Sequence, residues 1–293
     1  MTKTVLITGT SSGFGRQLVP EFLNAGWTVI ATLRDASKRS ELFTADLATS
    51  PDRLFVLSLD VAQEDERVAA AGFIDRQFEG KLDCLVNNAG FGLFGALEDL
   101  SEEQIRRQME VNFFGLVLLS RSLLPQLRRA RGRIINITSA LGYLGMPLTS
   151  LYCASKFAVE GLSESLYYEL KPHGVQVAIV EPGAYRTEFS GNQMSGEGTE
   201  DDGSPYRPQF RSLKRYRQSR LSGPGQSVDS VIQAVVRLAQ AERMPMRVRC
   251  GRDAKLGYMM KRLLPETMQR GLMSKLYGKM FSSKEERSAD GAA

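Results

Sequence analysis

Short apolar segments alternate with longer amphipathic segments along most of this chain of 293 residues. The short segments are rich in β-branched residues, as strands buried on both faces are, and they cover residues 4–8, 28–32, 54–59, 82–87, 132–138 and 175–181. The amphipathic segments predict helices at residues 13–25, 63–78, 101–129 and 151–171, of which the third is long enough to be two helices. This alternation predicts an α/β fold, a single-domain doubly wound parallel sheet with helices on both faces.

The pattern changes after residue 181. Residues 190–225 are rich in Gly, Ser, Pro, Gln and Arg without a clean period, so we expect a long loop, which in a compact domain is either disordered or a functional lid. Its position after a strand end, where ligands of such sheets bind, favours a substrate lid. Further on, the sequence predicts a helix at residues 227–241 and an edge strand at residues 246–250. We therefore expect a catalytic domain over residues 1–250 and a helical tail over residues 251–293.

A glycine-rich turn joins the first predicted strand to the first predicted helix. Glycine lets the backbone turn tightly, and it lets a pyrophosphate approach the helix N-terminus, where free amides and the helix dipole attract anions. A structural turn explains such a sequence equally well, and its G-x-x-x-G-x-G spacing differs from the usual G-x-G-x-x-G fingerprint. Its place between a strand and a helix nevertheless predicts the dinucleotide site of a Rossmann-type domain. The residues expected to contact the cofactor in this turn are Gly9, Ser11, Ser12, Gly13, Phe14 and Gly15.

The end of the second predicted strand indicates which dinucleotide is bound. Sites for NAD carry an acid there for the ribose 2′-hydroxyl, whereas sites for NADP offer a cation to the 2′-phosphate. Leu33 stands where the acid is expected, and Arg34 follows with a planar guanidinium that suits phosphate. Arg16 and Ser11 are candidates to assist. We expect NADP(H); NAD(H) remains the alternative, in which Asp35 binds the ribose and Arg34 is only solvated.

Asp60 and Val61 follow the third predicted strand. We expect them to hold the adenine through a carboxylate and a backbone amide. An N-cap for the helix predicted from residue 63 explains Asp60 equally well.

Tyr152 and Lys156 lie four residues apart near the start of a predicted helix, so both side chains share one helical face. A phenol ordinarily titrates near pH 10. An ammonium beside it stabilises the phenolate and lowers the pKa, which makes the tyrosine a general acid/base. Tyr167 and Lys171 have the same spacing, so spacing alone is weak evidence. Only the first pair lies where a helix begins and has an upstream partner serine, Ser139.

With these motifs in place, the chain resembles the short-chain dehydrogenase/reductase family over residues 3–189 and, more loosely, to residue 250. The matching motifs are Thr8-Gly9-x-x-x-Gly13-x-Gly15, Asp60, Asn87-Asn88-Ala89-Gly90, Asn112, Ser139, Tyr152-x-x-x-Lys156 and Pro182-Gly183 followed by Thr187. The segments around Arg34 and Tyr152 look like the branch that contains 17β-hydroxysteroid and retinol dehydrogenases.

The resemblance implies a role for each matched residue. Tyr152 would transfer the proton, and Ser139 would donate a hydrogen bond to the substrate carbonyl. Lys156 would hold the nicotinamide ribose and, with the positive charge of the cofactor, lower the pKa of Tyr152. Asn112 lies in a predicted helix interior, where asparagine is unfavourable, so it would mark a kink that exposes a carbonyl to the water of a proton relay. The other matched residues expected to contact the cofactor are Asn87, Ala89, Gly90, Pro182, Gly183 and Thr187.

The expected activity is the NADP(H)-dependent interconversion of a hydrophobic alcohol and its ketone or aldehyde by hydride transfer. The predicted loops at residues 91–94 and 141–146, together with Tyr185, are mostly apolar and favour a hydrophobic substrate, although simple loop packing explains them equally well. A non-catalytic NADPH-binding redox sensor or scaffold is one alternative. A sugar-nucleotide epimerase or dehydratase is the other, although such enzymes resemble a branch with a different glycine spacing.

Composition is that of an ordinary globular protein, with 42% hydrophobic and 24% charged residues and a net charge of +5. Three distant cysteines, Cys84, Cys153 and Cys250, argue against a disulfide framework and a metal site and fit a reducing compartment. The single histidine, His173, is expected to lie at a helix end on the surface. We find no nucleic-acid motif, signal peptide or membrane-spanning run, so we expect a cytoplasmic protein.

Basic residues gather at residues 207–220 and 243–284. A solvated surface explains them, and contact with an anionic cofactor or a membrane is the alternative. In the tail, Met and Leu residues alternate with Lys and Arg, but Pro265 and Gly271 interrupt the pattern. This favours packing over the substrate pocket or against another subunit and leaves peripheral membrane contact open. The expected partners are a hydrophobic small molecule and further copies of the chain, in a homodimer or homotetramer.

Overall fold

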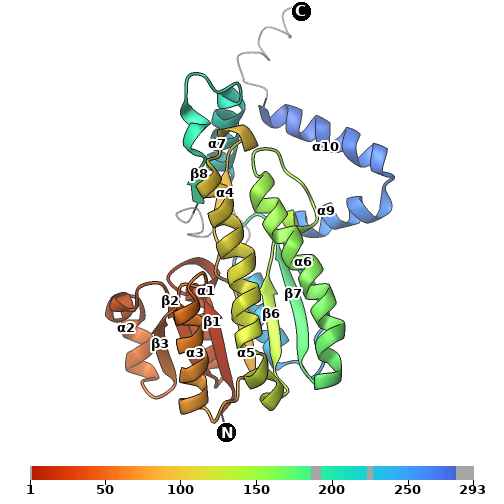
Figure 1. The fold of residues 1–293 in the computed structure, drawn as a ribbon. Helices are drawn as coiled ribbons and strands as arrows, with labels where there is room; N and C mark the ends of the chain where they lie inside the picture. The colour runs from red at the N-terminus through yellow and green to blue at the C-terminus, as the bar shows by residue number, and fades with distance from the viewer. Residues whose placement is uncertain (1, 186–192, 223–226, 282–293) are drawn as a thin grey trace, which may run out of the picture.

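The apolar β-branched segments form one parallel sheet, and the amphipathic segments cover both of its faces (Figure 1). The computed structural model describes residues 2–185, 193–222 and 227–281. Within these ranges the sheet has seven strands, in the order β3-β2-β1-β4-β6-β7-β9. Their bounds are Thr4–Thr8 (β1), Thr28–Leu33 (β2), Leu54–Ser58 (β3), Cys84–Asn87 (β4), Arg133–Ile137 (β6), Gln176–Pro182 (β7) and Arg247–Cys250 (β9). The expected doubly wound sheet is confirmed, and its strand order reverses between β1 and β4, where a ligand crevice opens at the carboxyl ends.

Two helical layers bury the sheet. The layer on one face consists of α1 (Gly13–Asn24), α2 (Arg39–Thr49) and α8 (Asp229–Gln240), and that on the other consists of α3 (Glu64–Gln77), α5 (Leu116–Ala130) and α6 (Ser150–Leu170). Successive side chains of a strand point to opposite faces. In β1, Val5 and Ile7 therefore join the core beneath Phe22 of α1, whereas Leu6 joins the core beneath Leu119 of α5.

The segment at residues 190–225, expected to be a loop, is largely regular where the structure describes it. It contains β8 (Gln193–Ser195), which pairs with β5 (Gly92–Phe94), and α7 (Arg207–Ser222). The expectation of an irregular loop was therefore wrong for these residues. The sequence pattern was weak because α7 buries only two large apolar side chains, Phe210 and Leu213, which pack on Phe94. Helix α2 was missed as well.

The tail forms two helices, α9 (Arg252–Leu263) and α10 (Glu266–Phe281), which turn back toward α7 at the carboxyl end of the sheet (Figure 1). The Tyr277 hydroxyl on α10 donates a hydrogen bond to the Gly145 carbonyl at 2.7 Å, and the Tyr143 hydroxyl donates one to the Ala254 carbonyl at 2.7 Å. The tail is thereby attached to the loop that follows β6. None of the helices in the described ranges has the length and apolarity to cross a bilayer.

Candidate active site

The glycine-rich turn is attached to the end of β4 at the point where strand order reverses. The Thr8 hydroxyl accepts hydrogen bonds from the backbone amides of Asn88 and Ala89, each at 2.9 Å. The Asn88 side chain donates to the carbonyls of Thr8 and Gly9, at 2.8 and 3.0 Å. Gly9 has a φ of +70°, and a Cβ on Gly15 would lie 2.2 Å from the Gly9 carbonyl oxygen. The turn therefore requires glycine at both positions.

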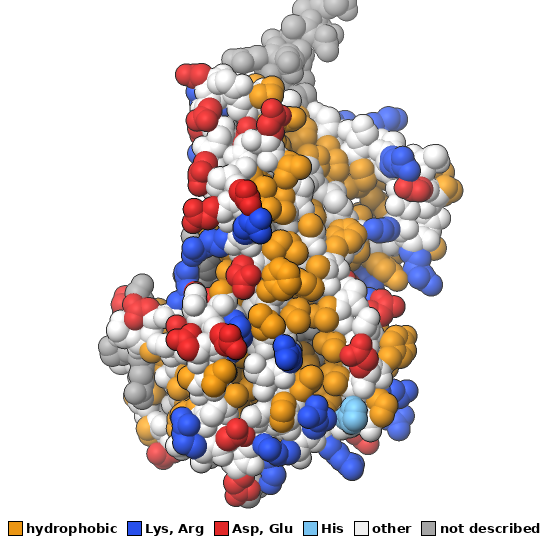
Figure 2. Space-filling model, viewed as in Figure 1, with side chains coloured by type: hydrophobic (Ala, Val, Ile, Leu, Met, Phe, Trp, Pro, Cys, Tyr) orange, Lys and Arg blue, Asp and Glu red, His pale blue; other side chains and the backbone are white. Residues whose placement is uncertain are grey.

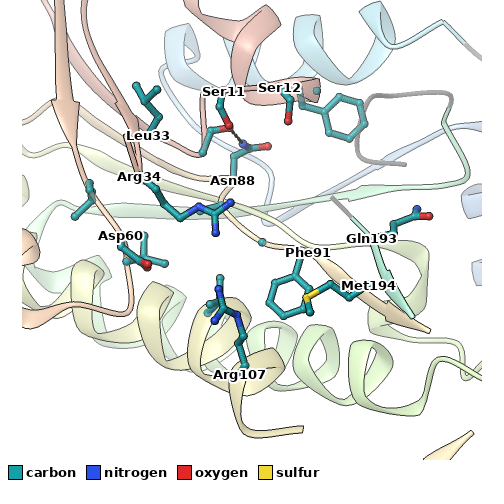
Figure 3. Close-up of a pocket in the computed structure, with 18 residues that line it drawn as sticks. Ser11, Ser12, Leu33, Arg34, Asp60, Asn88, Phe91, Arg107, Gln193 and Met194 are labelled. Carbon is teal, nitrogen blue, oxygen red and sulfur yellow. Dashed lines mark hydrogen bonds between the residues drawn. The ribbon is translucent and has the colours of Figure 1, made fainter. Parts of the chain in front are cut away.

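A cavity of about 290 Å³ opens next to this turn (Figure 3). It brings together most of the residues expected to bind the dinucleotide, from four separate segments: Gly9, Ser11, Ser12, Gly13, Phe14, Arg34, Asp60, Val61, Ala89 and Gly90. The Ser12 side chain does not cap α1, so the amides of the first helical turn are available to an anion. Turn, cavity and helix N-terminus together fit a dinucleotide.

Five residues line this cavity that were not among the expected site residues: Leu59, Arg107 of α4 (Glu102–Met109), Val111, and Gln193 and Met194 of β8. The last two belong to the segment that was expected to form a lid. Figure 3 shows the Arg34 and Arg107 guanidinium groups directed into the cavity from opposite sides. Neither forms an ion pair with a described residue. Arg107 lies one helical turn before Val111, so both side chains share one face of the helical segment. This spacing identifies Arg107 as a cavity residue only once α4 is known to border the cavity.

Three other residues that were considered for the ribose and adenine sites, Arg16, Asp35 and Asp60, interact with other parts of the protein. Arg16, a candidate to assist Arg34, forms an ion pair with Asp46 at 2.7 Å and does not line the cavity. Asp35 accepts a hydrogen bond from the Ser37 amide at 3.0 Å and does not line it either. The Asp60 carboxylate accepts from the Ala62 amide at 3.0 Å, whereas the N-cap of α3 is Gln63. Asp60 is therefore not the N-cap of that helix.

Tyr152 and Lys156 lie near the start of α6, buried at 8% and 7% exposure. The Lys156 Nζ is 5.8 Å from the centroid of the Tyr152 ring and donates a hydrogen bond to the Ile137 carbonyl at 3.0 Å. Burial raises the pKa of Tyr152 to about 12, and the hydrogen bond with Ser139 opposes this rise. Burial also lowers the pKa of Lys156 to about 8, against the influence of Glu160. The expectation that Lys156, together with the positive charge of the cofactor, lowers the pKa of Tyr152 stays a prediction.

Asn112 lies in a π-helical stretch, Glu110–Gly115, between α4 and α5. Its side-chain amide donates to the Phe91 carbonyl at 2.9 Å and to the Ser155 hydroxyl at 3.3 Å, and its oxygen accepts from the Phe91 amide at 3.0 Å. The Ser155 hydroxyl in turn donates to the Tyr152 carbonyl at 2.7 Å. The expected helix irregularity is present, and such bulges are frequent at functional sites. Here it ties the segment after β4 to the helix that carries Tyr152.

Asn87 lies behind the cavity and does not line it. Its side chain is 3% exposed and donates to the Ser120 hydroxyl at 3.0 Å and to the Asn136 side chain at 2.8 Å. Asn136 donates to Ser163 at 2.8 Å. This buried network joins β4, β6, α5 and α6, so the structure places Asn87 where it positions the strands that carry the site.

Pro182 is the last residue of β7 and Gly183 follows it, next to the end of β6 that precedes Ser139. A Cβ on Gly183 would lie 2.1 Å from the Asp253 carboxylate. Thr187 lies outside the described residues.

The second tyrosine–lysine pair and the single histidine lie away from the site. Tyr167 packs in the core at the far end of α6, and Lys171 and His173 are exposed in the turn after it. All three cysteines are buried thiols. Across the described ranges, no group of side chains has the composition of a metal site.

Two buried acids, Glu160 and Glu181, lie behind the catalytic residues and were not indicated by the sequence. Thr138, next to Ser139, donates to Glu160 at 2.6 Å. Arg249 lies 2.8 Å from the Glu181 carboxylate and Arg247 lies 3.5 Å from it. Burial, together with the neighbouring Glu160, raises the pKa of Glu181 to about 7, while the two arginines oppose this rise.

This raised pKa predicts a pH-dependent stability. The folded chain binds the Glu181 proton more tightly than the unfolded chain, so the free energy of unfolding should fall as the pH rises from the ordinary carboxyl range to about 7. Glu181→Gln should remove this decline in the free energy of unfolding, which amounts to about 3 kcal/mol. Denaturant unfolding on both sides of this window measures it. Glu164→Gln is the matched control, because Glu164 contacts the same Arg247 but is 54% exposed. An unchanged pH dependence in Glu181→Gln would contradict the assignment.

Comparison with known proteins gives a consistent result. A sequence model of the short-chain dehydrogenase family matches residues 3–198. Retinol dehydrogenase 8 of Homo sapiens is 36% identical over 256 residues, which cover 84% of this chain and 80% of that protein. The 3-ketodihydrosphingosine reductase of Bacteroides thetaiotaomicron is 38% identical over 224 residues, 75% of this chain and 77% of that protein. The 17-beta-hydroxysteroid dehydrogenase type 1 of Homo sapiens is 42% identical over 196 residues, 65% of this chain and 59% of that protein.

Solved structures share the fold. A short-chain dehydrogenase from Streptomyces avermitilis matches with a TM-score of 0.76 and 32% identity over the full length of both chains. ElxO with NADP bound matches with a TM-score of 0.69 and 26% identity, over 85% of this chain and 97% of that one.

Proposed function

Because the chain belongs to the short-chain dehydrogenase/reductase family and is an oxidoreductase, we propose that it interconverts a hydrophobic alcohol and its ketone or aldehyde, with NADP(H) as the hydride carrier. The observation that supports this most strongly is the arrangement of Tyr152, Lys156 and Ser139 at the carboxyl end of β6. These three residues do not line the dinucleotide cavity, but Asn112 is hydrogen-bonded both to Phe91 in its wall and to Ser155 of the helix that carries Tyr152. Membership of the family and the likeness to retinol and hydroxysteroid dehydrogenases agree with the resemblance found in the sequence.

The side chains suit proton transfer at a carbonyl. The nicotinamide supplies the hydride for reduction, or accepts it in the reverse direction, when the cofactor is bound. The hydroxyls of Ser139 and Tyr152 are hydrogen-bonded to each other, so both can contact one substrate oxygen and stabilise the negative charge that develops on it. Tyr152 donates the proton. Lys156 places a buried ammonium beside that phenol and has a lowered pKa of about 8, which eases proton return to Tyr152.

The preference for NADP(H) rests on two cations. Arg34 and Arg107 face the cavity from β2 and α4, and the acid nearest to Arg34 along the chain, Asp35, is hydrogen-bonded to Ser37. A 2′-phosphate between two guanidinium groups would gain charge-assisted hydrogen bonds. ElxO was solved with NADP, whereas a 26% identical 3-ketoacyl-(acyl-carrier-protein) reductase from Brucella melitensis was solved with NADH, so the choice within this family depends on such local residues.

An apolar region beside the catalytic residues supports a hydrophobic substrate. The buried side chains of Phe94, Phe210 and Leu213 pack with those of Met146 and Leu148, which belong to the loop after β6. Figure 2 shows hydrophobic side chains gathered between α4 and α6 and continuing toward α10. The names of three relatives refer to retinol, a hydroxysteroid and ketodihydrosphingosine, all of which are largely apolar molecules.

A substrate screen tests the proposal. We expect NADPH oxidation with long-chain and polycyclic ketones or aldehydes. We also expect kcat/KM to rise with the apolar surface of the substrate, by roughly fourfold for each buried methylene. Tight NADPH binding without turnover across the whole panel would instead favour a redox sensor or scaffold.

We also propose that the protein is cytoplasmic and assembles as a homodimer or homotetramer. Phe114 and Tyr168, which are 46% and 64% exposed near α5 and on α6, support an apolar contact between subunits.

A further inference from the structure

The two tail helices expose apolar side chains in regular stripes. We call α9 and α10 together the C-terminal arm. The exposed fractions are 59% for Leu256, 54% for Met259, 71% for Leu263, 58% for Met268, 38% for Leu272 and 48% for Leu276. Spacings of three and four residues place each set of three on one face of its helix. The arm therefore carries an apolar surface that the rest of the described chain does not cover.

This surface is separate from the side of α10 that contacts the body of the protein. Tyr277 is hydrogen-bonded to Gly145, and Met280 and Phe281 pack beside Phe210 of α7. At the turn between the helices, Gln269 donates to the Leu264 carbonyl at 2.7 Å. Tyr277 and Met280, three residues apart, lie on a different face of α10 from the stripe of Met268, Leu272 and Leu276.

The basic excess of the whole chain lies in the same arm. Residues 252–281 contain seven Lys and Arg and two Asp and Glu, which gives +5, the net charge of the entire chain. The remaining sequence therefore has equal numbers of basic and acidic residues. Both acids of the arm have partners on the protein, because Asp253 accepts from the Ala184 amide and Glu266 pairs with Arg270.

The basic residues border the apolar stripes. On α9, Lys255 and Arg262 lie four residues before and three residues after Met259. On α10, Lys275 lies three residues after Leu272. Cations that border an exposed apolar stripe are typical of helices that lie in the interface of an anionic bilayer. A subunit interface fits less well, since lysine is depleted in such contacts, and nucleic acid would leave the leucine and methionine side chains unused.

We propose that the C-terminal arm docks on the surface of an anionic lipid bilayer. The leucine and methionine stripes enter the headgroup region, and Lys255, Arg262 and Lys275 contact lipid phosphates. The arm is attached to the loop after β6 at Tyr143 and Gly145, so docking brings the apolar region beside the catalytic residues close to the lipid. Only this last consequence, substrate supply from the bilayer, rests on the proposed function.

Flotation of the full chain with vesicles tests the docking without any activity measurement. We expect binding to an equal mixture of phosphatidylserine and phosphatidylcholine, weaker binding to phosphatidylcholine alone, and loss of binding in high salt. Each basic residue near an anionic surface raises the affinity for that surface about fivefold. The triple variant Lys255→Gln/Arg262→Gln/Lys275→Gln should therefore bind these vesicles about a hundredfold more weakly. The matched control is Arg121→Gln/Arg128→Gln/Lys171→Gln, which removes the same charge from exposed positions on α5 and after α6. Thermal unfolding checks that both variants are folded.

A second variant separates docking from assembly. Leu263→Gln/Leu272→Gln should bind vesicles about tenfold more weakly and should elute unchanged in size-exclusion chromatography without lipid. A change of oligomeric state in this variant would identify the arm as a subunit interface and overturn the proposal. Equal binding to both kinds of vesicle, binding to neither, or an equal loss in the control variant would overturn it as well.

Discussion

Tyr152→Phe should lower kcat for carbonyl reduction by about a thousandfold, because general acid catalysis ordinarily contributes about a hundredfold to ten-thousandfold. The substitution removes only the hydroxyl. The ring remains in α6, and the Lys156 Nζ keeps its hydrogen bond to the Ile137 carbonyl. NADPH affinity should therefore change by less than about threefold, as measured by the quenching of protein fluorescence or by calorimetry.

The chain contains its own control for this experiment. Tyr167 has the same spacing to Lys171 as Tyr152 has to Lys156, but it packs in the core at the far end of α6. Tyr167→Phe should leave kcat within about twofold of the wild type. Turnover near the wild-type rate in Tyr152→Phe, with the protein folded and NADPH bound, would refute the role of this residue as the acid.

Arg34→Gln should raise the Kd for NADPH about tenfold to a hundredfold and leave the Kd for NADH within about threefold, because only NADPH carries the 2′-phosphate. We expect Arg107→Gln to act in the same direction by about tenfold, and the double variant to lose most of the discrimination between the two dinucleotides. The measurement is the Kd for each dinucleotide by titration, which does not depend on a known substrate.

Arg16→Gln is the matched control for these two variants. Arg16 also lies close to the glycine-rich turn, but its guanidinium is paired with Asp46 and does not line the cavity. The ratio of the two Kd values should therefore stay at the wild-type value in Arg16→Gln. A wild-type protein that binds NADH more tightly than NADPH would contradict the assignment of Arg34.

The sheet could be predicted from the sequence because each strand is a short, nearly continuous apolar segment. Buried parallel strands need apolar side chains on both faces, so Val5, Leu6 and Ile7 are recognisable without knowledge of their partners. Helices α2 and α7 were missed because they contribute few apolar side chains to the core. Helix α7 packs on the protein through Phe210 and Leu213, and its other residues are largely polar. Its stability therefore comes from tertiary contacts, which no local sequence pattern reveals.

The catalytic residues were recognisable for a different reason. Tyr152 and Lys156 belong to one helical turn, and Ser139 is close to them in sequence, so their association follows from local geometry. Arg107 reaches the same cavity as Arg34 only because the tertiary fold brings α4 and the end of β2 to opposite sides of that cavity. The acid pair of Glu160 and Glu181 likewise depends on the packing of α6 against β7.

The sequence by itself determined the alternation of strands and helices, the glycine-rich turn and the tyrosine–lysine pair, since each depends on residues within a few positions of one another. The tertiary structure alone decided which arginines face the cavity, which side of α10 is covered, and how strongly each ionisable group is buried. The pKa of Tyr152 illustrates the difference. Its neighbour Lys156 is evident from the sequence, whereas the burial that dominates the pKa depends on every element packed around it.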